Sequence, residues 1–202
     1  MKIKIIGSGI TGITTAYYLA RNNHEITIYD ERRYPAMATS YANGGQISAS
    51  NAETWNSWYN IRKATNWVFR KDAPLLISLK LNIDKINWLI KFIQSIPQRN
   101  SNTLKTCEMA LKANYLYSEI IKNEKIEFDI VKKGILHIYK SKNELENARI
   151  INNIYKSAGL DRWEVSPKEI KNIEPTISEK DILGGFYNTF DFTGDIHKFC
   201  IT

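Results

Sequence analysis

The sequence predicts an α/β fold that opens with a strand–helix–strand unit. A β-branched run at residues 2–6 leads directly into Gly7, Gly9 and Gly12, and the residues that follow have helical composition. A second β-branched run occupies residues 25–30. Strand-like and helical segments continue to alternate along the chain, which is typical of helices packed on a sheet.

The three glycines form a G-x-G-x-x-G motif between the first strand and a helix expected at residues 10–22. Gly7 allows a tight turn, Gly9 leaves room for the backbone to approach a pyrophosphate, and Gly12 with Ala16 lets the helix lie close to the sheet. The pyrophosphate would then meet the free N–H groups and the positive end of the helix dipole. The residues predicted to bind it are Ile6, Gly7, Ser8, Gly9, Ile10, Thr11 and Gly12.

An acidic residue, Asp30, ends the second strand. In dinucleotide-binding units a carboxylate at this distance from the glycine motif bonds to the adenosine ribose. We therefore expect Asp30 to contact the ribose. The alternative is a tight strand–helix turn that binds no ligand.

The segment at residues 31–48 contains too many small residues for an ordinary helix. Glycines allow a backbone to pass close to a ligand, so this loop is a second candidate cofactor element. The alternative is a plain surface connection. Its candidate binding residues are Ser40, Asn43, Gly44, Gly45 and Gln46.

Residues 55–95 have a helical pattern with many aromatic side chains. Such a stripe is usually core, and a lipid-facing surface is the alternative because Lys80, Lys85 and Lys91 flank it. Pro97 and the polar residues after it interrupt the pattern, which predicts one domain at 1–95 and another at 96–202. The aromatic residues are Trp55, Trp58, Tyr59, Trp67, Phe69, Trp88 and Phe92.

The second predicted domain mixes helices and strands. Gly159 ends one helix, and another begins at Ser166 with Pro167 at its first position and Glu169 completing a capping box. The expected elements are helices at 103–122, 143–158 and 167–174, strands on either side of Lys133–Gly134 within 127–139, a strand at 182–188, and a turn at 191–195.

The composition of the 202 residues, 43% hydrophobic and 24% charged, is that of an ordinary globular protein. The net charge of +7 comes with scattered lysines, so we expect compositional drift rather than nucleic-acid binding. Cys107 and Cys200 lack the spacing of a zinc site or a disulfide framework, and no metal site is expected. We expect neither a signal peptide nor a transmembrane span, whereas attachment to a membrane surface stays open.

Several stretches together carry a family resemblance. They are residues 6–12, 24–30, 39–48, 63–69 and 133–139, with Gly184, Gly185, Asp191, Thr193, Gly194 and Asp195. With these residues the chain closely resembles the N-terminal part of the small subunit of bacterial D-amino-acid dehydrogenase. That family belongs to the superfamily of D-amino-acid oxidase and sarcosine oxidase.

The resemblance implies FAD as cofactor, held by a Rossmann-like domain at residues 1–95, and an incomplete mixed-sheet α+β substrate domain at 96–202. Asp30 would contact the ribose, and residues 40–48 would pass the flavin. Such an enzyme oxidises a D-amino acid to an imino acid, which water converts to a 2-oxo acid and ammonium. Its electrons go to a respiratory acceptor, which implies a cytoplasmic protein, peripheral on the inner membrane.

The resemblance implies no acid–base residue, and we name no catalytic residue. His24, His137 and His197 are scattered along the sequence and are interpreted as structural. An NAD-linked dehydrogenase is a weaker alternative, since the glycines and Asp30 suit either dinucleotide.

The sequence departs from the family pattern in three respects. Thr54, Trp58, Tyr59 and Ile61 replace turn-forming residues, and Thr189 replaces a proline, which leaves the rim of the substrate site open to question. Family chains also continue well past residue 202. We therefore expect either a partner polypeptide that supplies the C-terminal part or, alternatively, an inactive remnant that is at best a nucleotide-binding module.

Overall fold

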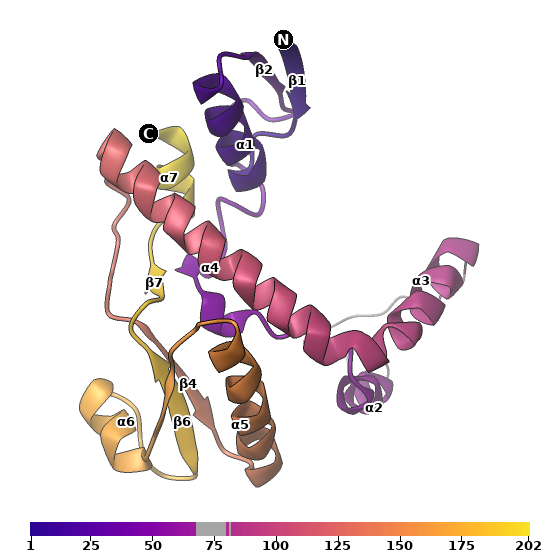
Figure 1. Ribbon diagram of the computed structural model, residues 1–202, viewed down its shortest axis with the longest axis vertical. Coiled ribbons are helices and arrows are strands. Elements are labelled where there is room, and N and C mark those ends of the chain that lie inside the picture. The colour runs from indigo at the N-terminus through magenta and orange to yellow at the C-terminus, as the bar shows by residue number, and fades with distance from the viewer. Residues whose placement is uncertain (68–79, 81) are drawn as a thin grey trace. The chain divides into compact units, whose positions relative to one another are not determined.

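The computed structural model describes residues 1–67, 80 and 82–202, without the side chains of residues 65–67 (Figure 1). The predicted Phe69 and the Trp67 side chain therefore lie outside the described part. The elements are β1 (Lys2–Ile6), α1 (Ile10–Arg21), β2 (Glu25–Tyr29), β3 (Gln46–Ile47), η1 (Ala49–Asn51), α2 (Trp58–Trp67), α3 (Ile83–Gln94), η2 (Ile96–Gln98), α4 (Arg99–Glu124), β4 (Ile135–Tyr139), α5 (Lys142–Ser157), β5 (Trp163–Val165), α6 (Pro167–Ile173), β6 (Gly184–Asn188), β7 (Phe192–Thr193) and α7 (Ile196–Ile201).

The chain forms two compact units, and neither is continuous in sequence. The first contains residues 1–48, 112–136 and 187–202, and the second contains 49–111 and 137–186. The sequence predicted one division near residue 95, but the structure divides the chain at other places. The difference arises because segments distant in sequence share a hydrophobic core, and this sharing has no local sequence signal.

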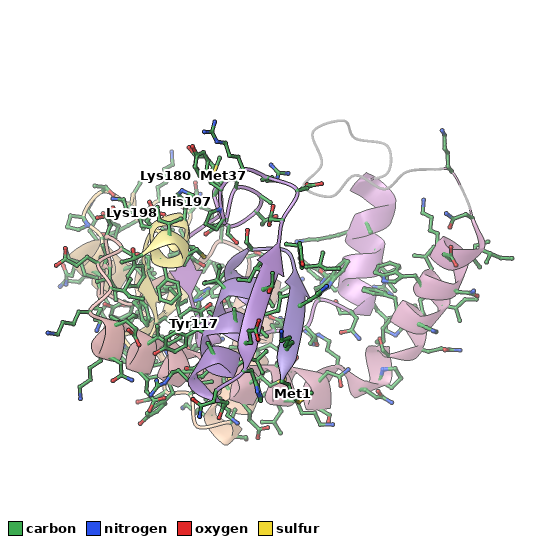
Figure 2. The ribbon with its side chains drawn as sticks, turned by 90° about the horizontal axis from the view of Figure 1, so that it is seen from above. Met1, Met37, Tyr117, Lys180, His197 and Lys198 are labelled. Carbon is green, nitrogen blue, oxygen red and sulfur yellow. The ribbon has the colours of Figure 1, made fainter. Side chains whose placement is uncertain are left out.

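The first unit contains the predicted strand–helix–strand start. β1 and β2 pair in parallel with Lys2 opposite Glu25, and they lie side by side in Figure 2. In both strands exposed residues alternate with partly buried ones, as expected for a sheet with one covered face. The core of this unit combines Ala36, Ile47, Ile120, Phe128, Phe192, Phe199 and Cys200, with Ile10, Ile13, Tyr17 and Tyr18 of α1 packed against it.

A short antiparallel pair joins the loop after β2 to the last part of the chain. Gln46 of β3 lies opposite Thr193 of β7, and Ile47 lies opposite Phe192. The Gly194 N–H donates to the Gly45 carbonyl oxygen at 2.9 Å. The predicted turn at residues 191–195 is thus where the chain returns to residues 45–47.

The second unit is built around a three-stranded sheet of order β4-β6-β5. Helix α5 follows β4 and buries Leu145, Ala148, Ile151, Asn152 and Tyr155. Helix α6 begins with the predicted capping box, in which the Ser166 side chain and Glu169 satisfy each other's backbone N–H groups.

Three sequence predictions differ from the structure. Residues 127–132 form no strand, because Asp129 has a positive φ of 54° that interrupts extended backbone, and only Val131 makes an isolated bridge to Thr193. Helix α4 begins at Arg99 instead of 103, directly after the short helix η2 that contains Pro97. The strand β5 was not predicted, because three residues are too few for a pattern.

The aromatic segment is not the core that its pattern predicted. Helix α3 buries none of its residues, and Trp55, Trp58, Tyr59 and Trp88 are exposed. Among the described residues, no helix is both long and apolar enough to cross a membrane.

Candidate functional site

The glycine turn after β1 has the geometry that its sequence predicted. Gly7 has a φ of +97°, a conformation that strains other residues, and its N–H donates to the Tyr29 carbonyl oxygen at 2.7 Å. Gly9 is the extended N-cap residue of α1. The chain therefore leaves β1, turns at Gly7 and enters α1 within three residues.

Gly12 is required by the turn itself. A Cβ on Gly12 would lie 2.0 Å from the Gly7 carbonyl oxygen and 3.6 Å from the Ile5 side chain. A Cβ on Gly9 would lie 3.3 Å from the Ser40 hydroxyl oxygen. Because Gly9 and Gly12 have no side chains, the first turn of α1 can pack against the turn that follows β1, as predicted for Gly12.

Asp30 lies beside the glycine turn. Its Oδ2 accepts hydrogen bonds from the Ser8 N–H at 2.7 Å and the Ser8 hydroxyl at 2.6 Å, and its Oδ1 accepts from the Arg32 N–H at 2.8 Å. The hydrogen bond from the Ser8 side chain, followed by those from the Ser8 and Arg32 backbone, lowers the pKa of Asp30 to about 2. The carboxylate is therefore ionised throughout the neutral range.

The Asp30 carboxylate has room to accept one more hydrogen bond, from a ligand. An ionised carboxylate has about four lone-pair sites. Three protein donors reach Asp30, and its side chain is exposed. A hydroxyl group such as that of a ribose could supply the fourth donor.

Ser40 joins the two predicted cofactor elements. Its hydroxyl oxygen accepts a hydrogen bond from the Ile10 N–H at 3.0 Å, and its side chain is buried. Gly9 has no side chain with which to cap α1, so Ser40 performs this role from 30 residues away. The loop at 31–48 is consequently held at the N-terminus of α1.

The rest of the loop is shaped by Asn43 and two glycines. The Asn43 side chain donates to the Ser40 carbonyl oxygen at 2.9 Å and accepts from the Gly45 N–H at 2.6 Å. Gly45 has a φ of +60°, and a Cβ there would lie 2.5 Å from the Gly194 carbonyl oxygen. Gly44 and the Gln46 side chain are exposed, so Asn43 and Gly45 shape the loop while Gly44 and Gln46 face solvent.

The structure brings most of the predicted residues together. Ser8, Ile10, Asp30 and Ser40 are linked by hydrogen bonds around the glycine turn. Ile6 is 92% exposed at the end of β1, and Thr11 is also exposed. These two residues make no contact that explains their predicted role.

Sequence reasoning missed several groups that support this site. The Ala36 N–H donates to the Ser8 carbonyl oxygen at 3.0 Å, and His197 Nδ1 lies 3.3 Å from the Ala36 carbonyl oxygen. Figure 2 shows His197 of α7 close to the loop that carries Met37. Asp191 is fully buried and accepts from the Ser48 hydroxyl at 2.9 Å. No periodicity or spacing marks these pairs, because Ser8 and Ala36 are 28 residues apart and the other two pairs are separated by 161 and 143 residues.

The histidines are separate, as expected of structural residues. His24 lies near the N-terminal amine, His137 bonds to the Ser50 hydroxyl at 2.8 Å, and His197 contacts Ala36. In the part of the chain that the structure describes, no three His, Cys, Asp or Glu side chains gather as metal ligands would.

The residues around the turn fit the ADP part of a dinucleotide. A helix N-terminus, which favours anions, follows a turn that excludes Cβ atoms, and an ionised carboxylate lies at the carboxyl end of the neighbouring parallel strand. Asp30 would bind the ribose, and the hydrogen bonds from Ser8 to Asp30 and from Ile10 to Ser40 would hold the binding elements in place.

Known proteins share both the sequence and the fold. The family model described as "DAO: FAD dependent oxidoreductase" matches residues 2–202. A D-amino acid dehydrogenase of Mesorhizobium japonicum is 45% identical over 98% of this chain and 48% of its own length. One of Dechloromonas aromatica is 33% identical over 98% of this chain and 49% of its own length. The chain spans about half the length of the curated relatives it matches.

Solved structures agree at the level of fold. L-proline dehydrogenase from P. horikoshii superposes with a TM-score of 0.67 and 16% identity, covering 98% of this chain and 39% of its own. L-α-glycerophosphate oxidase from Mycoplasma pneumoniae, with FAD bound, gives a TM-score of 0.57 and 17% identity over 99% of this chain and 42% of its own.

Proposed function

The chain belongs to the family of FAD-dependent oxidoreductases, and we propose that it forms the N-terminal part of an enzyme that oxidises D-amino acids. The family, the α/β fold class and FAD as the family's cofactor were predicted from the sequence and are confirmed. The binding roles of individual residues stay predictions.

The main support for this proposal is the set of hydrogen bonds around the glycine turn. Asp30 and Ser40 come from separate predicted cofactor elements, yet both bond to residues 8–10 at the start of α1. We infer that this group holds the ADP part of FAD, with Asp30 on the ribose. When bound, FAD would supply the hydride-transfer chemistry of the oxidation. The protein binds and orients the cofactor.

The substrate assignment rests on the relatives. Both named relatives are D-amino acid dehydrogenases, and the chain covers about half of each. We propose that the second half of the family fold, on the same or a partner polypeptide, completes the site for a D-amino acid. The imino acid product would then hydrolyse to a 2-oxo acid and ammonium.

A chimera tests this function directly. Residues 1–202 would be fused to the C-terminal half of the Mesorhizobium japonicum relative, and the product purified. We expect flavin absorbance at about 450 nm and reduction of a dye acceptor when D-alanine is added. The matched control carries Asp30→Ala, which should lower flavin content while the chimera stays folded.

Two results would contradict the proposal. A folded chimera that lacks flavin would contradict the cofactor site. A flavin-loaded chimera that oxidises none of a panel of D-amino acids would favour the inactive remnant instead.

A further inference from the structure

Ala36 has a backbone conformation that alanine rarely adopts. Its φ is +58°, in the left-handed region, where a Cβ crowds the carbonyl oxygen that follows it. Strain of this kind persists only where surrounding contacts hold the residue in place, and it is concentrated at functional sites. Ala36 is 1% exposed and belongs to the core of the first unit. Contacts within that unit must therefore maintain the strained conformation.

Two hydrogen bonds hold Ala36 on either side of its Cα atom. Its N–H donates to the Ser8 carbonyl oxygen, in the glycine turn, at 3.0 Å. Its own carbonyl oxygen lies 3.3 Å from Nδ1 of His197. A carbonyl oxygen can only accept a hydrogen bond, so this contact requires a proton on Nδ1 of the His197 ring.

The ring of His197 is itself held in place. Tyr41 packs edge-on against it, with ring centroids 4.9 Å apart and an angle of 75° between the planes. His197 belongs to α7, and Phe199 of the same helix is buried in the core that contains Ala36. His197 is thus a fixed point against which the Ala36 carbonyl group can be held.

Apolar packing does not account for the conformation of Ala36 by itself. Packing of a methyl group in a core is not directional, so it does not select a value of φ. A hydrogen bond is directional, and a buried carbonyl oxygen that loses its donor is costly. The contact with His197 therefore favours the left-handed conformation in which the carbonyl oxygen meets Nδ1.

The conformation of Ala36 determines the direction of the chain after it. Four residues later, the Ser40 hydroxyl oxygen accepts from the Ile10 N–H at the start of α1. Ala36 and Ser40 thus attach the loop to residues 8–10 at two points. Rotation of Ala36 to a negative φ would redirect the chain between these points, so that both hydrogen bonds could not be kept.

We propose that His197 is a positioning residue for the cofactor. Its Nδ1–H holds Ala36 in the left-handed conformation, and Ala36 in turn keeps Ser40 at the start of α1. The effect of His197 on cofactor affinity rests on the proposed function, whereas its effect on the loop does not.

The position of the proton is tested by NMR on the unmodified chain. Nitrogen-15 chemical shifts of the imidazole rings at pH 8.5 distinguish a proton on Nδ1 from one on Nε2. We expect His197 to carry its proton on Nδ1. A His197 ring protonated on Nε2 alone would overturn the proposal.

Two variants of nearly the same shape separate the hydrogen bond from side-chain volume. His197→Asn keeps an N–H donor near the position of Nδ1, and His197→Leu has none. Exchange of the Ala36 N–H with solvent should become roughly fivefold faster in His197→Leu and change little in His197→Asn. The Gly7 N–H, which donates to the Tyr29 carbonyl oxygen, is the control and should keep its rate in both variants.

A glycine at position 36 should make His197 dispensable, because glycine adopts a positive φ without strain. In the chimera described above, His197→Leu should weaken flavin binding by roughly fivefold. Adding Ala36→Gly should restore most of the affinity. Ala38→Gly is the matched control, because it places a glycine in the same loop at a residue without a positive φ, and it should restore nothing.

Three further results would overturn the proposal. They are an unchanged exchange rate of the Ala36 N–H in a folded His197→Leu variant, equal flavin affinity of that variant and the unmodified chimera, and equal losses in His197→Leu and His197→Asn. Absence of flavin from every chimera would contradict the proposed function instead. In that case the exchange rates and the position of the proton would still decide the role of His197.

Discussion

The hydrogen bonds of Ser8, Asp30 and Ser40 show what single residues contribute to the candidate site. The glycines and Asp30 were predictable, because the conformational demands of a strand–turn–helix unit act within a few residues. The bonds that join Ser8 to Asp30 and Ile10 to Ser40 were not, since they connect residues 22 and 30 positions apart. A sequence pattern names these residues without saying which of them bond.

The Ser8 hydroxyl should control the ionisation of Asp30. Its hydrogen bond is the largest cause of the pKa of about 2, so Ser8→Ala should raise that pKa toward the usual 3.8. The backbone donors of Ser8 and Arg32 remain, so the pKa should still lie below 3.8. Carboxyl chemical shifts in an NMR titration would measure both values.

The same shift predicts how acid affects the fold. Because the pKa of Asp30 is lower in the folded state, its stabilising contribution is present above pH 3.8 and is lost as pH falls toward 2. The loss should be smaller in Ser8→Ala. An unchanged Asp30 pKa in that variant would contradict the hydrogen bond.

Gly12 should tolerate no side chain. In Gly12→Ala the new methyl group would collide with the Gly7 carbonyl oxygen, and such overpacking costs about 1–3 kcal/mol. Urea unfolding would measure the loss. Gly44→Ala is the matched control, because a Cβ there meets nothing within 4 Å, and its stability should be nearly unchanged.

At the scale of elements, sequence signals that lie next to the end of a helix predicted that end correctly. The capping box of α6 and the glycine after α5 lie next to the ends they define, and both were predictable. The prediction of a strand at 127–132 was wrong. The sequence there has a strand-like pattern, but Asp129 adopts a left-handed conformation that interrupts extended backbone. Periodicity also could not tell a buried aromatic helix from the exposed α3.

The two serine caps should separate stability from cofactor binding. Ser40→Ala leaves the Ile10 N–H without its acceptor, and Ser166→Ala removes the cap of α6, so each should cost about 1 kcal/mol. Flavin affinity of the chimera should fall only in Ser40→Ala. Equal flavin affinity in both variants would remove Ser40 from the proposed site.

At the scale of the molecule, the family was predictable and the division into compact units was not. Specific stretches such as residues 39–48 carried the resemblance, and the match over residues 2–202 bears it out. The compact units, in contrast, combine three and two separate stretches of chain. No shift in composition marks the positions where the chain passes from one unit to the other.

This division predicts that residues 1–95 do not fold alone. The core of the first unit requires Ile120, Phe128, Phe192 and Phe199, all beyond residue 95. A fragment of residues 1–95 should therefore show no cooperative urea transition by circular dichroism, whereas residues 1–202 should show one. A cooperative transition in the fragment would mean that the shared core is dispensable.

The pairing of β3 with β7 has a consequence for biosynthesis. Gln46 and Ile47 find their strand partners only at Phe192 and Thr193, nearly 150 residues later. During translation, the segment that carries Ser40 and Asn43 must wait for these partners to emerge from the ribosome. Nascent chains therefore acquire a settled coenzyme loop only after residues 192 and 193 have emerged from the ribosome.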